Sequence, residues 1–521
     1  MTTQSARAGL ALGFLLGVLP GLHAAAAPPE EPAAKLPSGQ VIESVRALEN
    51  PAQSYALYLP SSYTPDRTWP LLMAFDPFAE GVTPVKLFAD AAEKYGYIVV
   101  GSNNSKNGPS GPEVEAFNAL WREVHARFRV DDGRVYATGL SGAARFSSAV
   151  ASSCRCLAGV ILSGAGFPPD HPPAAGMKFA VYVAVGEYDF NFPELIQLRQ
   201  ELERDQVAHH LNIFDGSHQW MPPAVAQAAI AWLNLQAMVR GTLLRDDAFI
   251  AAQWAERLQQ AQTEGRKHDA YAAFYSYSSL AADFGSLRDV SEARAAAERL
   301  RGSPEFHRAQ ARIDDEIRKQ SSIAAPIIAR MRMLASNPNA EIASPAPIQQ
   351  PPAMGGGMTS GGMMGGGGMG RSSVGAGPEQ NSGGPSQSVR QWLEGELTSL
   401  RQQRERERNP EKLTVLRRAL GEVFVETSES GSTMVEARNY RAAAGYFELA
   451  TFAAPKASAE LHYQAAAAYC LDGDKKQSLR VLRQAVAEGF HDGARLEQDR
   501  DFDALRSSPE FQAVVASVPA K

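Results

Sequence analysis

The sequence predicts an α/β fold, with a doubly wound and mostly parallel sheet, followed by an all-α region. Between residues 36 and 240, short apolar runs alternate with stretches of helical spacing, which is the order of a parallel sheet covered by helices on both faces. From residue 242 onward, strand signals give way to helical spacing interrupted by one Gly-rich stretch. The length of 521 residues and the hydrophobic content of 44% suffice for about two to four domains.

The strands and helices of the first region follow from local patterns. Residues 69–75 (WPLLMAF) form a compact apolar run that suits a strand buried on both faces. Residues 112–129 place Phe117, Leu120 and Val124 on one stripe, as in an amphipathic helix. The other strands are expected at 54–60, 98–102, 134–139, 159–162, 179–185 and 210–214, and the other helices at 84–95, 142–152, 193–205 and 222–238.

Residues 1–26 are predicted to be a signal peptide. Arg7 is the only charged residue among the first 29, and an apolar run over 9–22 precedes small residues suited to cleavage. The run is too short for a typical membrane span of roughly 20 residues. We therefore expect an exported protein, periplasmic or secreted, with no integral membrane span after cleavage.

The region after residue 240 is expected to contain three parts. Residues 242–340 have helical spacing and are a candidate for divergent repeat units. Residues 341–388 are rich in Gly, Pro and Met, and such a stretch cannot bury enough apolar surface to fold, so a flexible linker is expected. Residues 389–521 are helical again.

An internal repeat in the last part resembles tetratricopeptide repeats. Small and large residues alternate in the order that packs a helix pair, and the order recurs after 35 residues. The residues concerned are Ala443, Phe447 and Ala450, then Ser478, Leu482 and Ala485, with Ala466 and Tyr469 between them. A second repeated sequence occurs at residues 300–306 (LRGSPEF) and 505–511 (LRSSPEF). The resemblance implies helices that dock a protein partner or the substrate.

Charge and cysteine content exclude several kinds of protein. Lys and Arg number 51 against 57 Asp and Glu, a net charge of −6 that argues against nucleic acid as the main partner. Three Cys rule out a disulfide-stapled scaffold and a four-thiolate zinc site, and no metal-binding motif occurs. Cys154 and Cys156 are expected to be small buried hydrophobes, because a bond across one residue would be strained, with a redox pair as the alternative.

The candidate nucleophile is Ser141. It lies in Gly139-Leu-Ser141-Gly-Ala143, directly after a predicted strand and at the start of a predicted helix. This is the setting of a nucleophile elbow, in which small neighbours keep the strand and the helix from clashing. The motif departs from G-x-S-x-G at its last position, where Ala143 replaces Gly.

A general base and an orienting acid follow Ser141 in the order that such a site requires. Asp189 comes just after the strand predicted at 179–185, with Glu187 as the alternative acid. His218 lies in the loop after the last predicted strand. His218 would take the proton of Ser141 and later protonate the leaving group, while Asp189 would orient the imidazole.

The oxyanion and substrate positions are also expected at strand ends. Gly142 would supply one backbone N–H to an oxyanion, and Phe78 the second, because Pro77 has none. Candidate substrate-binding residues are Asn103, Asn104, Tyr188 and Trp220. A turn is the alternative for the two asparagines, and loop packing the alternative for the aromatic residues, which include Phe190.

Residues 36–240 resemble the alpha/beta hydrolase superfamily, most closely secreted esterases of the dienelactone hydrolase and polyhydroxybutyrate depolymerase or feruloyl esterase type. The resembling residues are the Ser141 elbow, Gly186-x-x-Asp189 and Gly216-x-His218. The resemblance implies hydrolysis of an ester without a metal or organic cofactor. Two features depart from the family: Asp76-Pro77 replaces the common His-Gly, and Ser141 stands where dienelactone hydrolases have Cys.

The sequence thus predicts an exported serine hydrolase that cleaves a carboxylic ester in a small or polymeric substrate. One alternative is a catalytically silent hydrolase fold that serves as a protein-binding scaffold. Another is a serine peptidase, because fold resemblance does not decide between ester and amide.

Overall fold

The computed structural model describes residues 36–108, 110–267, 269–336, 341–342, 387–454 and 458–518. The predicted signal peptide and most of the predicted linker lie outside these residues. The chain forms two compact units. The first unit extends to Ala324 and includes Gln402–Glu429, and the second consists mainly of Ala325–Arg401, Ser430–Phe452 and the residues from Ser458 onward.

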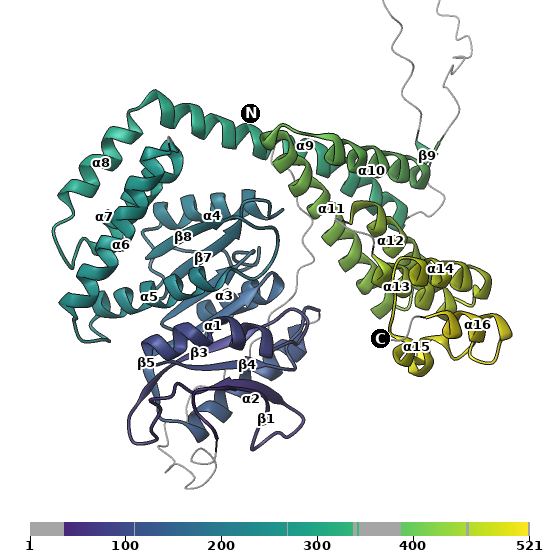
Figure 1. The fold of residues 1–521 in the computed structure, drawn as a ribbon, viewed down its shortest axis with the longest axis horizontal. Coiled ribbons are helices and arrows are strands. Elements are labelled where there is room, and N and C mark those ends of the chain that lie inside the picture. Colours follow the sequence, from purple (N-terminus) through teal and green to yellow (C-terminus); the bar gives the residue numbers. More distant parts are fainter. Residues whose placement is uncertain are drawn as a thin grey trace, which may run out of the picture. The chain divides into compact units, whose positions relative to one another are not determined.

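The first unit is built on an eight-stranded sheet in the order β1-β2-β4-β3-β5-β6-β7-β8 (Figure 1). β1 pairs antiparallel with β2, and β2 antiparallel with β4, whereas all the other pairs are parallel. The strands are β1 (Val41–Arg46), β2 (Ser54–Tyr58), β3 (Trp69–Phe75), β4 (Ile98–Ser102), β5 (Val130–Leu140), β6 (Gly159–Ser163), β7 (Ala180–Gly186) and β8 (His209–Phe214). The predicted α/β class is confirmed. Sequence patterns missed β1 because this edge strand is largely exposed and has no continuous apolar run.

Helices cover both faces of the sheet, and two separate apolar clusters form the core. The helices are α1 (Val82–Tyr95), α2 (Ser110–Arg127), α3 (Gly142–Cys154), α4 (Phe192–Arg204) and α5 (Pro223–Arg240). Leu71, Met73 and Phe75 of β3 pack with α2, α3 and α4, whereas Leu72 packs with α1 and α5. This alternation is the period of a strand that is buried on both faces, as its sequence predicts.

The carboxyl ends of the parallel strands bring the predicted site residues to one edge of the sheet. Asp76 follows β3, Ser141 follows β5, and Asp189 and His218 lie in the loops after β7 and β8. Parallel strands end on the same side, which is where ligands bind in open α/β sheets.

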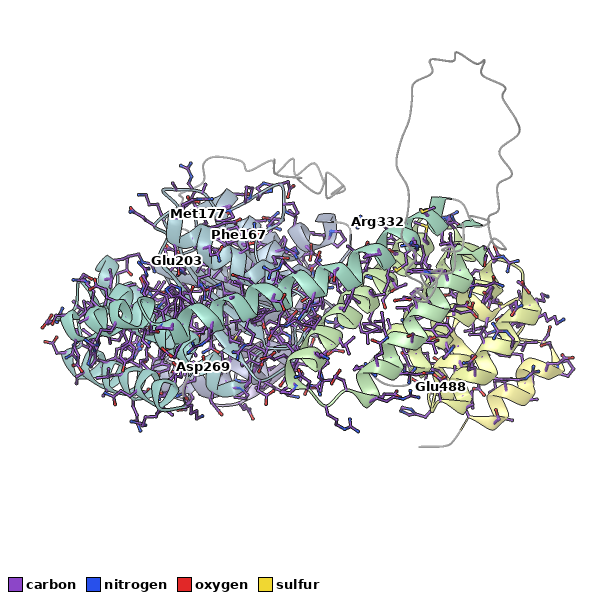
Figure 2. The ribbon with its side chains drawn as sticks, turned by 90° about the horizontal axis from the view of Figure 1, so that it is seen from above. Phe167, Met177, Glu203, Asp269, Arg332 and Glu488 are labelled. Carbon is purple, nitrogen blue, oxygen red and sulfur yellow. A yellow bond between two sulfur atoms is a disulfide. The ribbon has the colours of Figure 1, made fainter. Side chains whose placement is uncertain are left out.

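Four further helices continue the first unit: α6 (Asp247–Arg266), α7 (Ala270–Phe284), α8 (Ser291–Arg301) and α9 (Pro304–Ser336), the last extending into the second unit. Asp269, labelled in Figure 2, precedes α7 and caps it by accepting a hydrogen bond from the N–H of Ala272. Trp254 and Phe284 pack edge to face between α6 and α7. The first twenty residues of α11 (Pro410–Glu436) also belong to this unit.

The described residues of the second unit are all helical apart from one short ladder, and this confirms the predicted class of the C-terminal region. Its elements are α10 (Val389–Arg406), α12 (Tyr440–Ala453), α13 (Ala459–Leu471), α14 (Lys475–Ala487), α15 (Gly493–Gln498), the 3₁₀ helix η2 (Arg500–Phe502) and α16 (Pro509–Ser517). The small residues of the internal repeat allow close packing: Ser478 on α14 is fully buried and donates a hydrogen bond of 2.7 Å to the carbonyl of Ala466 on α13. Assignment of these helices to tetratricopeptide repeats stays a prediction.

Both ends of the predicted linker form secondary structure. β9 (Glu341–Ile342) and β10 (Gln387–Ser388) pair antiparallel, with Ile342 opposite Gln387. Two-residue strands have no recognisable sequence signal, and the residues between them lie outside the described part of the chain.

The repeated heptapeptide adopts the same local structure at both positions. In residues 300–306 and 505–511, the serine at position four donates its N–H to the carbonyl of the leucine at position one, over 2.9 Å and 2.8 Å. Its hydroxyl then accepts from the N–H of the phenylalanine three residues on, over 3.2 Å in both cases. Ser303 and Ser508 thereby cap the helices that begin at Pro304 and Pro509.

The expectation for Cys154 and Cys156 was wrong in one respect. Both are half-buried against the core, but they are joined by a disulfide, with a Cα–Cα distance of 5.1 Å. The physical reason is Arg155, whose left-handed backbone (φ 56°) reverses the chain at the end of α3 and brings the two thiols together. Cys470 is free and buried.

Among the helices that the structure describes, none combines the length and apolar character needed to cross a membrane.

Candidate active site

Ser141 occupies a strained turn between β5 and α3. Its backbone has φ 57° and ψ −124°, a conformation that costs a non-glycine residue about 1–3 kcal/mol. A Cβ atom at Gly139 would overlap the carbonyl oxygen of Ala143, so glycine is required where the strand meets the helix. Strain of this kind is typical of a nucleophile held away from its helix and strand.

Asp189 and His218 form a hydrogen-bonded pair. Nδ1 of His218 lies 3.0 Å from both carboxylate oxygens of Asp189, which is fully buried. A Cβ at Gly186 would overlap the carbonyl oxygen of Gly216, so this glycine lets the two loops approach. Glu187, the alternative acid, has an exposed side chain. The structure therefore brings Asp189, rather than Glu187, to the imidazole.

The second ring nitrogen of His218 is buried and has no hydrogen-bond partner among the described residues. Because Nδ1 faces a carboxylate, the proton of a neutral imidazole belongs on Nδ1, and Nε2 carries the lone pair. A buried lone pair without a partner is poised to accept a proton from a nucleophile or a substrate.

Two residues that sequence reasoning missed support this pair. Gly164, in the loop after β6, has φ +68°, and a Cβ there would lie 3.0 Å from Oδ2 of Asp189 and 3.1 Å from Nδ1 of His218. Asn191 donates its backbone N–H to Oδ1 of Asp189 over 2.8 Å and its side-chain amide to the carbonyl of Gly164. The spacing Asp189-x-Asn191 is the signal of an Asx turn and could have suggested the first contact.

Of three aromatic side chains in these loops, Phe190 contacts His218, whereas Trp220 and Tyr188 contact other residues. The ring of Phe190 is 4.3 Å from the imidazole of His218. Trp220 donates its indole N–H to Oδ2 of Asp76 over 2.9 Å, so it is tied to the loop after β3. Tyr188 is partly exposed and stacks with Arg417 of α11 at 4.6 Å.

Phe78, the residue expected to supply the second oxyanion donor, has its backbone N–H engaged within the loop after β3. Its N–H donates to Oδ1 of Asp76 over 2.8 Å, while its side chain is 76% exposed. The physical reason is the buried carboxylate of Asp76, which needs donors and takes those of Phe78 and Trp220. Gly142 is the first residue of α3, whose N–H has no partner in that helix, and its role as an oxyanion donor stays a prediction.

The side chains of Asn103 and Asn104 both bond the β1–β2 hairpin in this structure, so substrate binding by these residues stays a prediction. Asn104 accepts a hydrogen bond from the N–H of Ser54 over 2.8 Å and donates to the carbonyl of Ala52. Asn103 donates to the carbonyl of Glu43 over 3.2 Å. Both amides are used to hold the β1–β2 hairpin against the end of β4.

Asn107, later in the same polar cluster, is the asparagine that reaches the site. A Cβ at Gly142 would overlap its side-chain amide, so the amide lies directly against the start of α3. Its Oδ1 is buried without a hydrogen-bond partner in the described part of the chain. Its backbone N–H donates to the carbonyl of Pro77 over 2.9 Å, which ties it to the loop after β3.

Charged side chains from α3, α4 and α11 lie near the candidate site. Arg145 of α3 makes two hydrogen bonds of 2.7 Å with Glu194 of α4. Burial raises the pKa of Glu429, at the end of the α11 segment in this unit, and electrostatic interaction with His218 and Arg145 lowers the same pKa. Among the described residues, no three His, Cys, Asp or Glu side chains are arranged to hold a metal ion.

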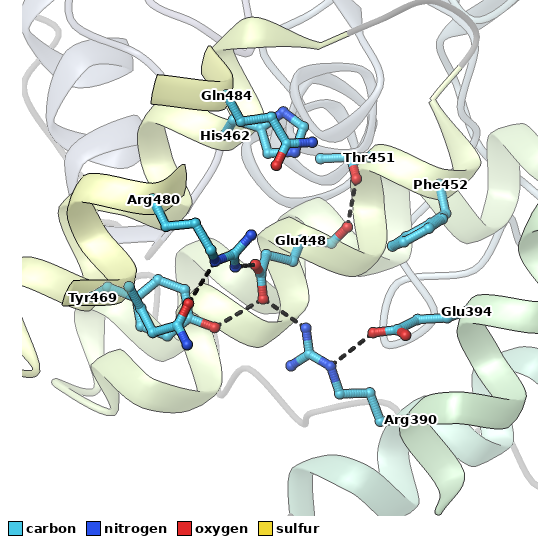
Figure 3. Close-up of a pocket in the computed structure, with 10 residues that line it drawn as sticks. Arg390, Glu394, Glu448, Thr451, Phe452, His462, Tyr469, Arg480 and Gln484 are labelled. Atoms are coloured by element: carbon cyan, nitrogen blue, oxygen red, sulfur yellow. Dashed lines mark hydrogen bonds and ion pairs between the residues drawn. The ribbon is translucent and has the colours of Figure 1, made fainter. Parts of the chain in front are cut away.

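The second unit contains a separate polar cavity of about 430 Å³ (Figure 3). At its centre, Glu448 accepts hydrogen bonds from Arg390 and Tyr469, and from Arg480 (Figure 3). His462 also lines the cavity. The residues that line this cavity are mostly charged or polar, and some of them, such as Arg480, are partly exposed.

The comparisons with known proteins give similarity to solved structures alone. No protein-family model matches the sequence, and no curated protein matches it. S-formylglutathione hydrolase from Staphylococcus aureus is 14% identical over 38% of this chain and 98% of that one, with a TM-score of 0.31. An esterase from Pyrobaculum calidifontis is 13% identical over 40% and 87%, with a TM-score of 0.32. Esterase 2 from Thermogutta terrifontis is 14% identical over 37% and 91%, with a TM-score of 0.30.

Proposed function

We propose that this chain is a serine hydrolase that cleaves a carboxylic ester, with Ser141 as nucleophile, His218 as general base and Asp189 as the orienting acid. The observation that carries the proposal is the Asp189–His218 pair, with a buried lone pair on Nε2, at the sheet edge where Ser141 occupies a strained turn. Each of the three roles falls on a residue at the end of a parallel strand.

The proposed reaction begins when Nε2 of His218 removes the proton of the Ser141 hydroxyl as its oxygen attacks the ester carbonyl. Asp189 holds the Nδ1 proton and stabilises the imidazolium that forms. The imidazolium then protonates the departing alcohol, which leaves an acyl group on Ser141. Water, deprotonated by the same imidazole, then attacks the acyl carbonyl. The imidazolium returns its proton to the Ser141 oxygen as the acyl–oxygen bond breaks, which releases the acid and restores the enzyme.

The oxyanion that forms at the carbonyl requires two donors. We assign one to the N–H of Gly142 and the second to the side-chain amide of Asn107. Because the N–H of Phe78 is bound to Asp76, the amide against Gly142 is the better placed donor. Rotation of that amide by half a turn exchanges its oxygen and nitrogen, so Nδ2 can face the oxyanion.

An ester, rather than an amide, is the proposed substrate. Phe190 offers an apolar ring beside His218, and Trp220 lies near the same edge, which suits an acyl or aromatic group. The test is hydrolysis of p-nitrophenyl esters of increasing acyl length, with a p-nitroanilide amide and the Ser141→Ala variant in parallel. Ester turnover that disappears in the variant supports the proposal. Faster amide turnover would favour a peptidase, and equal rates in both proteins would favour a silent scaffold.

We propose, second, that the second unit docks a protein partner. Its cavity is lined by Arg390 and Arg480, whose side chains are partly exposed, and by Glu394. The charge-reversed Arg480→Glu chain is the test. A partner that binds the full-length chain at a measured affinity should bind this variant at least about tenfold more weakly. Equal affinities would refute docking at this cavity.

Export to the periplasm or medium is likewise a proposal. The disulfide between Cys154 and Cys156 is consistent with an oxidising compartment. The mass of the protein recovered from the producing cells tests it, because cleavage removes about 26 residues.

A further inference from the structure

The loop that carries Asp189 is contacted by helices that lie outside the sheet and its covering helices. The loop, residues 187–191, connects β7 to α4, and we name it, together with Phe192 at the start of α4, the acid loop. On its sheet side, Tyr188 donates its N–H to the carbonyl of Gly216 over 2.8 Å. On its other side it contacts α9 and α11, although α11 begins more than 200 residues later in the sequence.

Arg418 of α11 contacts both ends of the acid loop. Its Nε donates a hydrogen bond of 2.7 Å to the carbonyl of Glu187, and its guanidinium lies 3.7 Å over the ring of Phe192. The side chain is only 2% exposed and pairs with Glu316 of α9 at 3.5 Å. Burial lowers the pKa of Arg418 to about 10, which still leaves it charged near neutral pH.

Gln320 of α9 holds the middle of the acid loop. Its amide donates to the carbonyl of Phe190 over 2.8 Å and to Glu422 of α11 over 3.0 Å. Gly421 of α11 faces the same residue, because a Cβ there would lie 3.7 Å from Cβ of Phe190. Phe190 in turn contacts the imidazole of His218. The two helices therefore hold the residues on both sides of Asp189.

We propose that α9 and α11 form part of the active site, and that Arg418 and Gln320 are positioning residues that hold Asp189 against His218. This inference rests on the proposed function for its effect on catalysis. It assigns the segment 402–429 a role in the hydrolase itself, rather than in partner docking alone.

The physical basis is that backbone carbonyls away from water need hydrogen-bond donors. The carbonyls of Glu187 and Phe190 take their hydrogen bonds from Arg418 and Gln320, and a carbonyl that loses a buried partner moves to find another. Such a shift in the acid loop displaces Asp189 from Nδ1 of His218. A misplacement of about 1 Å in a catalytic group can cost roughly a hundredfold in rate.

The test compares the variants Arg418→Lys and Gln320→Met in the full-length chain. Lysine keeps the charge but lacks the planar fork that reaches the Glu187 carbonyl while covering Phe192. Methionine keeps the volume of glutamine without its amide. The control is Arg312→Lys, because Arg312 is an exposed arginine of α9 that pairs with Glu411 of α11 at 3.8 Å rather than with the acid loop.

Two measurements are made on each protein that retains its helical circular dichroism. Ester turnover should show kcat lowered about tenfold in both variants with KM little changed, the pattern of a misplaced catalytic group. Amide hydrogen exchange in residues 187–192 should be about tenfold faster than in wild type and in the Arg312→Lys control.

The outcomes separate the inference from the proposed function. Exchange and kcat that match the wild type in both variants would overturn the inference. Faster exchange in the acid loop would uphold the positioning role even if the wild type hydrolysed no ester, and in that case the proposed function would fail by itself. A similar change in the Arg312→Lys control would contradict a specific role for Arg418 and Gln320.

Discussion

The two halves of the candidate site are built in different ways. The acid–base half, Asp189 and His218, consists of two loop residues whose direct contact of 3.0 Å follows from their places after neighbouring parallel strands. In the proposed oxyanion half, Asp76 binds the backbone N–H of Phe78, and the side-chain amide of Asn107 lies against Gly142. The difference teaches that the order of strands can bring two side chains together. The order of strands does not determine which backbone N–H groups are left without an intramolecular acceptor and can bind an oxyanion.

The largest expected effect tests the acid–base half. Ser141→Ala and His218→Ala should each lower kcat by about 10⁴-fold or more, since both act in the same proton transfer. Steady-state kinetics on the best ester measures this. The double variant should be no slower than either single one, and a multiplicative loss would contradict their action as a unit.

Asn107→Ala should have the next largest effect, because it removes the proposed second oxyanion donor. Loss of one such donor costs about 10²–10³-fold in kcat with little change in KM. Asn107→Asp is a sharper variant, because its carboxylate would repel the oxyanion. If both variants kept wild-type kcat, the oxyanion half would have to use another donor.

The matched control is Asn104→Ala in the same polar cluster. Asn104 holds the β1–β2 hairpin through Ser54 and Ala52. We expect about 1 kcal/mol less stability in urea unfolding and an unchanged kcat. A fall in kcat comparable to that of Asn107→Ala would assign Asn104 to the substrate site.

Asp76→Asn tests the link between Phe78 and Trp220, which donate hydrogen bonds to different oxygens of the Asp76 carboxylate. The amide can accept only through one oxygen, so either Phe78 N–H or Trp220 Nε1 loses its partner. We expect kcat/KM to fall about tenfold, with a stability loss of about 1–3 kcal/mol. Thermal unfolding and ester kinetics on the same sample would show whether the two effects occur together.

The smallest effect concerns stability alone, through Glu113 in the first turn of α2. Burial raises the pKa of Glu113 to about 8, so the folded state binds a proton that the unfolded state has released. Between the ordinary glutamate pKa and about 8, stability should therefore fall as the pH rises, and change little from this group outside that window. Urea unfolding of wild type and Glu113→Gln between pH 5 and 9 measures it, and a wild-type slope that survives in the variant would contradict the assignment.

How much of this structure the sequence predicts depends on whether a feature follows from a local pattern or from residues that are distant in the sequence. The apolar run of β3 and the strand-to-helix turn at Ser141 are local patterns, and the structure has both elements. The disulfide across Arg155 was missed because it depends on a left-handed backbone at a non-glycine residue. The contact of Arg418 with the acid loop joins residues 231 positions apart, and no local pattern indicates it.

The heptapeptide repeat is an instructive contrast, since it reproduces its cap at both Ser303 and Ser508. There the structure depends only on neighbours within seven residues. At Asn103, Asn104 and Asn107 the residue type was informative, but the choice among three asparagines depended on the β1–β2 hairpin and on Gly142. The same local sequence therefore gives the same cap twice, whereas the roles of the asparagines depend on partners that are distant in the sequence.

The most direct test of the central claim is covalent labelling of the full-length protein with a fluorophosphonate, followed by mass spectrometry of its peptides. The account predicts one adduct, on Ser141, that forms at a much lower rate in the His218→Ala variant. Absence of an adduct in folded wild-type protein, or an adduct on Ser141 that forms equally fast without His218, would contradict an activated serine at this site.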